Sequence, residues 1–527
     1  MVLYYNRENQ LKKQENCGML KKERKRKGFF DMKKKLCAGC RKTSCDGCQL
    51  KQYQKLHTNK SAVLTDVMGN AERKEDGFGL VFDVGTTTVA GYLWDLQTGK
   101  CLCAQSCENP QRVAGSDVVS RLSFCMDEKG VYQEARQRTL QQMMVRTLDR
   151  VAEELLVSAE FRDEVAEELL ASAEGGDEEL LELAEHREVV KRVVIVGNTV
   201  MCSILAGKSL EGLARAPFHK PYEECIREKG AAFGFSGLSQ AEVIILPAIE
   251  SFVGADALAV YRYVKEKDDR RNLLLVDIGT NGEIILIGKE TVYACSAAAG
   301  PALEGAAVAQ GMCATKGAVE AVSMTGNFPR EDISCKVIGG GRAEGICGSG
   351  LVDALALCRE MGVVDESGYL RSRAEARKAG VREKLCQRIA EEKGERKFLL
   401  TGADAPVYLT AEDIRQLQLA KGAVLAAIRL LLEKEGITAD EITRIYLAGA
   451  FGSYINPENA MAIGLLPKAA KEKVTAIGNG AALGGALALF SEEEVKEAQQ
   501  DAVRIKHVEA AKEPLFEAYF MEGISLP

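Results

Sequence analysis

Two aspartates in this sequence stand in the same local setting, although they lie in different halves of the chain. Asp83 lies in LVFDVGTTTVAGYLWD and Asp277 in LLVDIGTNGEIILIG. In each stretch an apolar run leads into the aspartate, a glycine and small polar residues follow, and a second apolar run returns. Such runs predict buried strands, so each stretch predicts a β-hairpin whose tight turn uses the conformational freedom of glycine.

A turn of this kind can bind an anion, because its successive N–H groups point outward and its hydroxyl groups add donors. A carboxylate at the end of the preceding strand supplies a hard oxygen ligand for Mg²⁺, directly or through water. Since the pattern occurs twice, we predict that two similar lobes clamp the phosphate chain of a nucleotide, with Asp83 and Asp277 on the metal. The alternative to a nucleotide clamp is that the two stretches are ordinary Asp-Gly hairpins. The residues assigned to the phosphates are Gly85, Thr86, Thr87, Thr88, Gly279, Thr280, Asn281 and Gly282.

Three further glycine motifs fit a clamp. In LPAIESFVGADALAVY (246–261) an apolar strand end precedes a helix, with Gly254 at a close-packing position. In RIYLAGAFGSYIN (444–456) a strand runs into a glycine-rich turn, which lets the backbone approach a ligand closely. In AIGNGAALGGALALF (476–490) a predicted helix carries small residues on one face, and such a face lets two helices cross tightly, as a hinge requires.

The order of these motifs resembles that of the actin-like ATPase superfamily, which includes actin, the seventy-kilodalton heat-shock proteins and sugar kinases. The resemblance implies a two-lobed α/β fold of the actin-like, or ribonuclease H-like, kind, with ATP and Mg²⁺ between the lobes. It also assigns the binding of adenosine to Gly449, Ala450, Phe451 and Gly452. The implied elements are two phosphate loops (83–88 and 277–283), an adenosine loop (447–452) and two connecting helices (251–261 and 478–490).

Longer motifs narrow the resemblance to the ATPase region of the reductive activators of corrinoid proteins. They are NPQRVAGSDVVSRL (109–122), VIVGNTVMCSIL (194–205), ACSAAAGPALEGAAVAQGM (294–312), EGICGSGLVDALA (344–356) and LTAEDIRQLQLAKGAVLAAI (409–428). Members of that family use ATP to return an inactive cobalt(II) corrinoid to cobalt(I). The resemblance therefore implies an ATP-hydrolysing enzyme whose partner is the corrinoid protein of a methyltransferase system. A separate ferredoxin as electron donor and a homodimer are left open.

ATP hydrolysis also needs a base or a group that positions water. Three acidic residues are candidates, and the sequence does not decide among them. Asp256 stands by the first connecting helix, where the superfamily often keeps a catalytic acid. Glu283 follows the second phosphate loop, and Glu304 follows Gly300-Pro301 in a loop of small residues. Any of the three could instead cap a helix.

Four cysteines near the N-terminus have metal-ligand spacing. After the basic stretch 21–35, CAGCRKTSCDGC contains Cys37, Cys40, Cys45 and Cys48. Four such thiols can hold one Zn²⁺ or one iron–sulfur cluster. The last three match part of a plant-type [2Fe–2S] spacing, so we expect a cluster, with zinc or unliganded thiols as alternatives. Well-known relatives carry a ferredoxin-type domain there instead. Four other cysteines are expected in the core: Cys202, Cys295, Cys313 and Cys347.

Length, composition and charge limit the possible partners, the location and the domain organisation of the protein. The chain has 527 residues, 46% of them hydrophobic and 28% charged, and its net charge of −7 argues against nucleic-acid binding. Neither a transmembrane run nor a signal-peptide core occurs, so we expect a cytoplasmic protein that does not act at a membrane. We expect a basic, Cys-rich segment (1–77), a first lobe (78–271) and a second lobe with a C-terminal tail (272–527).

Two functional alternatives and one insertion stay open. Instead of activating a corrinoid protein, the chain could donate electrons to another low-potential metalloenzyme, or act as a non-redox ATP switch or chaperone. The first lobe contains an acidic insertion (151–190), in which VAEELLVSAE (151–160) recurs as VAEELLASAE (165–174). This repeat predicts two amphipathic helices, either a docking surface or a solvated insertion.

Overall fold

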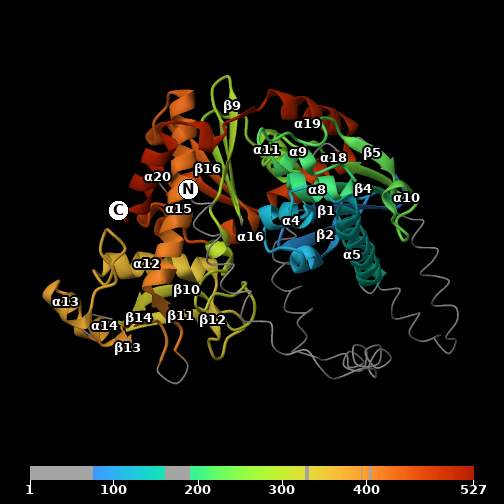
Figure 1. The fold of residues 1–527 in the computed structure, drawn as a ribbon. Helices are drawn as coiled ribbons and strands as arrows, with labels where there is room; N and C mark the ends of the chain where they lie inside the picture. The colour runs from blue at the N-terminus through green and yellow to red at the C-terminus, as the bar shows by residue number, and fades with distance from the viewer. Residues whose placement is uncertain are drawn as a thin grey trace, which may run out of the picture. The chain divides into compact units, whose positions relative to one another are not determined.

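The described part of the chain contains two large sheets (Figure 1). The structure is a computed structural model that describes residues 75–160, 190–279, 281–326, 332–392, 394–402, 406–469 and 471–527. All of these residues belong to one unit of the chain, His57–Pro527. The four N-terminal cysteines and the second copy of the acidic repeat lie outside the described residues.

The first large sheet combines an antiparallel meander with parallel strands. Its order is β3-β2-β1-β4-β6-β5, in which β1, β2 and β3 are antiparallel neighbours and β1, β4 and β6 run parallel. The edge strand β5 is antiparallel to β6. The strands are β1 (Phe78–Val84), β2 (Thr88–Asp95), β3 (Cys101–Glu108), β4 (Val190–Gly197), β5 (Ile226–Lys229) and β6 (Glu242–Ile245).

The second large sheet repeats this topology in five strands, while its sixth strand, β18, lies at the other edge, beside β9. Its order is β17-β16-β7-β8-β9-β18, in which β7, β8 and β9 form the antiparallel meander and β7, β16 and β17 run parallel. The repeated sequence pattern is therefore the first hairpin of each sheet, β1–β2 and β7–β8. The strands are β7 (Leu273–Ile278), β8 (Gly282–Ile287), β9 (Val292–Ala297), β16 (Arg444–Ala448), β17 (Val474–Gly478) and β18 (Lys506–His507).

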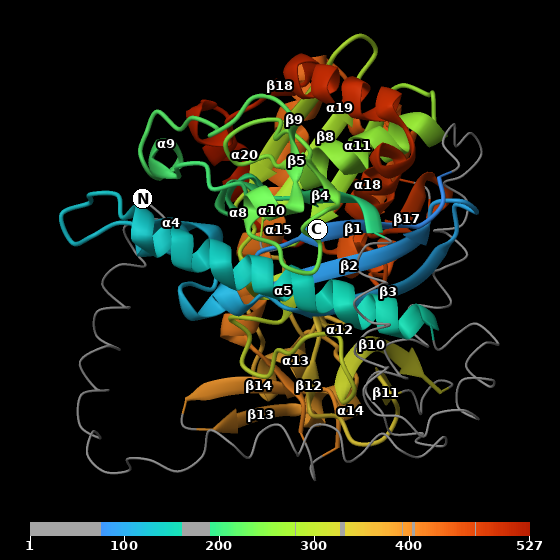
Figure 2. The same ribbon diagram turned by 90° about the vertical axis from the view of Figure 1, so that its right-hand side faces the viewer.

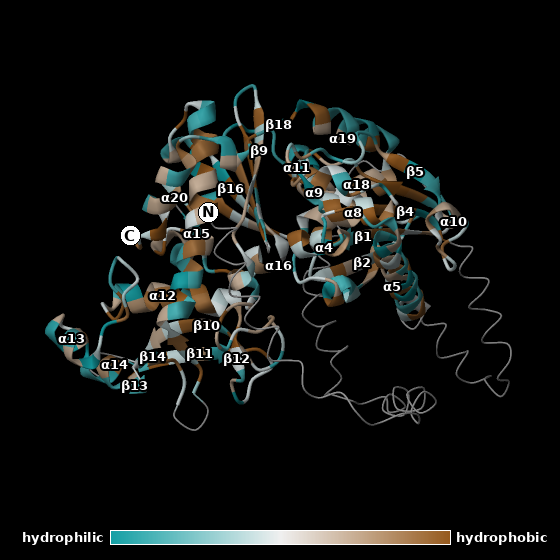
Figure 3. Cartoon of the chain, viewed as in Figure 1, coloured by the Kyte–Doolittle hydropathy of each residue, from teal (hydrophilic) through white to brown (hydrophobic). Residues whose placement is uncertain are grey.

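Helix α5 covers the antiparallel part of the first sheet (Figure 2). The first copy of the acidic repeat forms its last residues, where Val151 and Leu155 are buried. In Figure 3 the helix alternates hydrophobic and hydrophilic colours, so this copy contributes to the core through one face. The helices of this half are α4 (Val118–Phe124), α5 (Glu134–Glu160), α8 (Thr199–Leu205), α9 (Glu211–Ala214), α10 (Gly230–Phe233) and α11 (Ala255–Lys267).

The second sheet is accompanied by further helices and two small sheets, of order β11-β10-β12 and β13-β14-β15. The long helix α15 packs against α20 (Figure 1). The remaining helices of the described residues, of which α18 packs against the first sheet, are α12 (Gly348–Glu360), α13 (Arg373–Lys378), α14 (Glu383–Gln387), α15 (Ala411–Glu435), α16 (Gly449–Gly452), α17 (Pro457–Ala462), α18 (Gly480–Phe490), α19 (Glu492–Arg504) and α20 (Phe516–Ile524). The small strands are β10 (Ala318–Thr325), β11 (Asp332–Val337), β12 (Gly345–Ile346), β13 (Ile389–Glu392), β14 (Glu395–Leu399) and β15 (Tyr408–Thr410).

Helices α11 and α18 cross with almost no side chain between them. A Cβ atom at Gly484 of α18 would lie 2.7 Å from the Cα atom of Ala259 in α11. Gly485 faces the first sheet, where a Cβ atom would lie 2.7 Å from a methyl carbon of Val81. Both distances are too short for real atoms, so the two glycines permit the close crossing that the small-residue face predicts.

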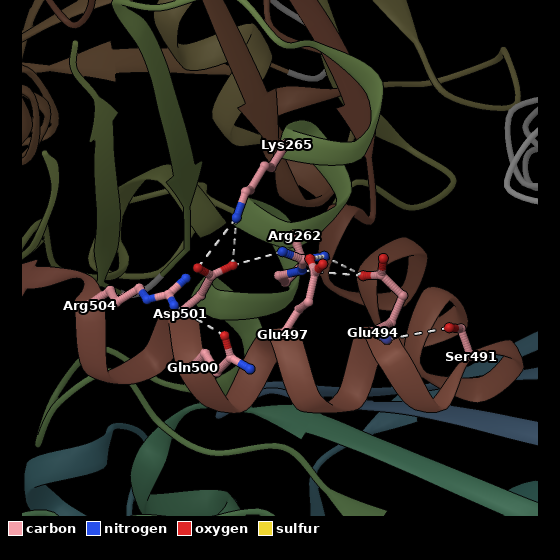
Figure 4. Close-up of polar contacts among 8 residues, drawn as sticks. All are labelled: Arg262, Lys265, Ser491, Glu494, Glu497, Gln500, Asp501 and Arg504. Atoms are coloured by element: carbon pink, nitrogen blue, oxygen red, sulfur yellow. Dashed lines mark hydrogen bonds and ion pairs between the residues drawn. The ribbon is translucent and has the colours of Figure 1, made fainter. Parts of the chain in front are cut away.

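A buried arginine joins α11 to α19 (Figure 4). Arg262 is 3% exposed and donates to Glu494 and to Asp501, each at 2.7 Å, and also to Glu497. Lys265 of α11 contacts Asp501 at 3.0 Å as well. Although burial alone would lower it, the pKa of Arg262 is raised above its usual value by these carboxylates. The network fixes α19 against α11.

Of the four cysteines that were predicted to lie in the core, three are buried and one is not. Cys202, Cys295 and Cys347 are buried, as expected for core residues. Cys313 is exposed. The reason is that its segment forms no helix or strand but a loop before β10, where small neighbours reflect turns rather than packing. Among the described residues, none of the helices combines the length and the apolar character that a membrane span requires.

Candidate functional site

Each predicted phosphate loop is closed by a hydrogen bond from the N–H of its first glycine, although the first loop is one residue longer. The N–H of Gly85 donates to Thr88 O at 3.0 Å, and the N–H of Gly279 donates to Asn281 O at 3.0 Å. Each loop follows a strand whose next-to-last residue is the predicted metal-binding aspartate, Asp83 or Asp277. The predicted loop residue Thr280 lies outside the described residues.

Helix α11 brings a third aspartate to the first loop. The helix begins at Ala255, after Gly254, rather than at the predicted residue 251, because Glu250 and Val253 pair in a tight turn. A Cβ atom at Gly254 would lie 2.5 Å from Cα of Asn198, so α11 starts in contact with the end of β4. Asp256 stands in the first turn of the helix, where burial, followed by the charge of Asp83, raises its pKa.

Five carboxyl groups form one electrostatic cluster, called here the carboxyl cluster: Asp83, Asp256, Asp277, Glu283 and Glu304. Burial raises the pKa of Asp83 to about 6, against the effect of a hydrogen bond from an asparagine. Burial and neighbouring aspartates raise the pKa of Asp256 and that of Asp277 to about 7. Burial, followed by the charges of Asp256 and Asp277, raises the pKa of Glu283 well above its usual value. Glu304 adds to the rise at Glu283.

The backbone explains why these groups meet. Asp277 of β7 pairs directly with Glu283 of β8, so the two side chains share one face of the sheet. A Cβ atom at Gly279 would lie 3.7 Å from Oε1 of Glu304, which places that carboxylate beside the second loop. The structure thus brings together all five acidic residues that the sequence singles out.

The carboxyl cluster suits a divalent cation. Within the described residues, Asp83, Asp256, Asp277 and Glu283 form no ion pair with lysine or arginine. Buried carboxylates without counter-charges have raised pKa values because ionisation is costly, and a bound cation removes that cost. No three His, Cys, Asp or Glu side chains of the described residues lie close enough to ligate one ion together. Mg²⁺ keeps several waters and takes further oxygens from substrate phosphates, so in general it needs only one or two protein carboxylates.

The predicted adenosine loop touches the same cluster. Ala448, at the end of β16, pairs with Asp277. Gly449 follows with φ of 80°, and a Cβ atom there would lie 2.5 Å from Oδ1 of Asp277. Phe451 packs near Gly348, the first residue of α12. Gly449, Ala450, Phe451 and Gly452 form the short helix α16, directly beside the second phosphate loop.

Two asparagines that sequence reasoning missed hold the first loop. Asn479 caps α18 by accepting from Ala482 N at 2.8 Å, and it donates from Nδ2 to Oδ2 of Asp83 at 2.7 Å. Asn198 donates from Nδ2 to Oγ1 of Thr86 at 2.9 Å and caps α8. Both follow a glycine at the end of a strand, in VGN and GNG, which is the only local signal the sequence offers.

The duplicated sheets, the paired loops at corresponding strand ends and the two crossing helices define an actin-like ATPase fold of two α/β lobes. Comparison with protein families agrees with this class. Residues 271–527 match the model described as the C-terminal domain of RACo, the ASKHA domain. Residues 78–176 and 177–265 match the RACo middle region.

Individual relatives identify the family. The corrinoid activation enzyme RamQ of Eubacterium limosum is 32% identical over 480 residues, which are 90% of this chain and 74% of the relative. The [Co(II) methylated amine-specific corrinoid protein] reductase of Methanosarcina barkeri is 27% identical over 317 residues, 55% of this chain and 54% of the relative. A solved structure of a reductive activator for corrinoid, iron–sulfur protein aligns with a TM-score of 0.69 and 27% identity, covering 86% of this chain and 67% of that one. The chain belongs to the RACo family.

Proposed function

We propose that this protein is an ATP-dependent reductive activator, which returns the cobalt(II) corrinoid of a partner protein to cobalt(I). Family membership supports the reaction class, and the carboxyl cluster between two matching loops is the observation that carries the ATP-dependent part. In this proposal ATP is the substrate that becomes ADP and phosphate, and one electron passes to cobalt from a low-potential donor.

The proposed roles follow from the chemistry of each group. Asp83 and Asp277 would hold Mg²⁺ through water, and the N–H groups of the two loops would hold the phosphates. Bound Mg²⁺ would supply charge neutralisation at the phosphates. Asp256 is the first candidate for the base that positions the attacking water, because a pKa of about 7 suits proton transfer near neutral pH. Glu283 and Glu304 are the alternatives.

In this proposal ATP acts on the conformation of the two proteins and not on the energy of the electron itself. ATP hydrolysis does not change the potential of the donor. It can help by stabilising an arrangement of the two proteins in which cobalt(II) is easier to reduce, and each 1.4 kcal/mol of that stabilisation shifts the equilibrium about tenfold. The α11–α18 crossing, where backbone meets backbone, is the place we propose for such a movement of the lobes.

The proposal includes the N-terminal cysteines as a metal site. Cys37, Cys40, Cys45 and Cys48 would hold an iron–sulfur cluster, or Zn²⁺ as the alternative, because four closely spaced thiols suit either. With a cluster, the segment would pass the electron to cobalt. With zinc, a separate ferredoxin would be the donor.

The test measures cobalt(I) directly. The protein is mixed under anaerobic conditions with a corrinoid protein, a low-potential reductant, Mg²⁺ and ATP, and cobalt(I) is followed by its absorbance. We expect cobalt(I) to form faster with protein and ATP together than with either omitted. Asp83→Asn and Asp277→Asn should each abolish the effect of ATP, while Asp269→Asn, outside the carboxyl cluster, is the matched control.

Two results would contradict the proposal. Cobalt(I) that forms equally fast without the protein or without ATP would exclude an activator. Binding to the corrinoid protein that changes with ATP, but without any reduction, would favour the non-redox switch or chaperone.

A further inference from the structure

The first phosphate loop rests on three buried polar side chains to which the proposed reaction assigns no role. They belong to the segment 109–122, the motif NPQRVAGSDVVSRL, which includes the start of the short helix α4. Asn109, Gln111 and Arg121 are all 0% exposed. Polar side chains are rarely buried to this extent unless they have a structural or functional task.

Three consecutive carbonyl groups of the loop accept hydrogen bonds from this segment. The amide of Asn109 donates from Nδ2 to Gly85 O at 2.8 Å. The guanidinium of Arg121 donates to Thr86 O. The backbone N–H of Asn109 donates to Thr87 O at 2.8 Å.

The planar peptide group turns these contacts into an orientation of the loop. In a trans peptide the carbonyl oxygen of one residue and the N–H of the next point in opposite directions. Because Asn109 holds Gly85 O and Arg121 holds Thr86 O, the N–H groups of Thr86 and Thr87 point to the other side of the loop. Within the described residues, neither of these two N–H groups meets an acceptor. Two adjacent free donors of this kind form an anion site.

Arg121 also brings a positive charge, and the acidic group that acts on it most is Asp117. Its Nε donates to Gly115 O at 3.1 Å, and its NH1 contacts Oε1 of Gln111 at 3.3 Å and Sδ of Met201 at 2.9 Å. All of these partners are neutral, and within the described residues Arg121 forms no ion pair. Asp117 lies on the same segment, but it caps α4. Burial lowers the pKa of Arg121 to about 10, so the side chain stays charged at neutral pH.

We propose that Arg121 is a positioning residue for nucleotide phosphates, and that the negative charge of the phosphates attracts its guanidinium group. Arg121 aligns the peptide group between Thr86 and Thr87 and polarises it, so that its N–H becomes a stronger donor. The guanidinium also places a positive charge on the side of the loop opposite to that N–H. This inference rests on the proposed function, since it concerns the phosphates of the same nucleotide. Asn109 holds the neighbouring peptide group without adding charge.

The experiment compares binding of adenosine, AMP, ADP and ATP by isothermal titration calorimetry, with Mg²⁺ present. For Arg121→Gln we expect a loss that grows with the number of phosphates, from less than about threefold for adenosine to about tenfold or more for ATP. Arg121→Lys keeps the charge without the planar fork and should recover part of the ATP affinity. The matched control is Arg192→Gln, a buried arginine that bonds Glu242 at 3.1 Å at the other end of the β1–β4 pair. Arg192→Gln should show no loss of affinity that grows with the number of phosphates.

Each result has a consequence. A loss that is equal for all four ligands, or no loss at all, would overturn the role of Arg121 while leaving ATP binding intact. A wild-type protein that binds no ATP would instead contradict the proposed function. Hydrogen–deuterium exchange on the wild type needs no variant. Amides of residues 85–88 should be protected by ATP and not by adenosine, and protection by both alike would also overturn the inference.

Discussion

Asp256→Asn should stabilise the nucleotide-free protein while impairing catalysis. Burial, followed by the charge of Asp83, raises the pKa of Asp256 from 3.8 to about 7. A group whose folded pKa is raised holds its proton more tightly in the folded state, so it favours folding less and less as the pH rises from about 4 to about 7. Above that window the ionised carboxylate carries the full penalty, which asparagine does not have.

The magnitude follows from the two pKa values. The difference of roughly three units corresponds to about 4 kcal/mol at full ionisation. The stability gained by Asp256→Asn should therefore rise from roughly 1 to 2 kcal/mol at pH 5 to roughly 4 kcal/mol at pH 8. The hydrogen bond from Ala257 N to Oδ1, at 2.8 Å, can be kept by the amide oxygen. The rate constant kcat for ATP hydrolysis should fall by about a hundredfold or more if Asp256 is the base.

The assay is urea unfolding of both proteins between pH 5 and pH 8 without nucleotide, together with steady-state ATP hydrolysis. Asp268→Asn is the matched control with the opposite sign. Hydrogen bonds from Arg270 lower the pKa of Asp268 to about 2, so its loss should destabilise the protein at neutral pH. A gain for Asp256→Asn that does not change with pH, or a loss at pH 8, would refute the electrostatic reasoning.

Three further predictions concern the same molecule. Binding of Mg²⁺ and ATP at pH 6.5 should release about one to two protons from the carboxyl cluster, seen by calorimetry in buffers of different ionisation enthalpy, and no buffer dependence would contradict this. Anaerobically purified protein should contain iron and sulfide, or zinc, and Cys40→Ser/Cys45→Ser should lose it; equal, near-zero metal in both would exclude the site. Arg262→Met should destabilise the protein by about 3 kcal/mol, because Glu494 loses its arginine partner and the buried Asp501 keeps only Lys265, and adding Asp501→Leu should recover part of this. Strictly additive effects in urea unfolding would be inconsistent with a coupled network.

The sequence predicted those features that depend on short stretches of chain. Each Asp-Gly pattern is local, because the strand, the turn and the carboxylate lie within a few residues, and the hairpins at Asp83 and Asp277 formed as expected. The family motifs then predicted which distant hairpins share one fold. The position of Glu283 opposite Asp277 follows from the register of the hairpin alone.

Other features of the site depend on contacts that no local pattern encodes. Asn479 reaches Asp83 across 396 positions of the chain. Arg121 could be seen in the sequence only as one of many basic residues, because its burial follows from the packing of three separate segments. Cys313 shows the reverse case, since small neighbours predicted a buried position and the residue lies in an exposed loop. These outcomes depend on tertiary packing, which overrides composition over a few residues.

The packing of α18 has a consequence for how the protein is made. Leu483, Leu489 and Phe490 belong to the same hydrophobic core as β1 and β4, and the Phe490 ring lies 5.8 Å from that of Trp94. The N-terminal half thus lacks part of its interior until nearly the whole chain has been synthesised. At 5–20 residues per second, the ribosome needs roughly ten to fifty seconds to extend the chain from α11 to α18. During that interval apolar surface of the first sheet stays uncovered, so the nascent chain is a natural client for chaperones, and truncation before residue 480 should leave an aggregating fragment rather than an isolated first lobe.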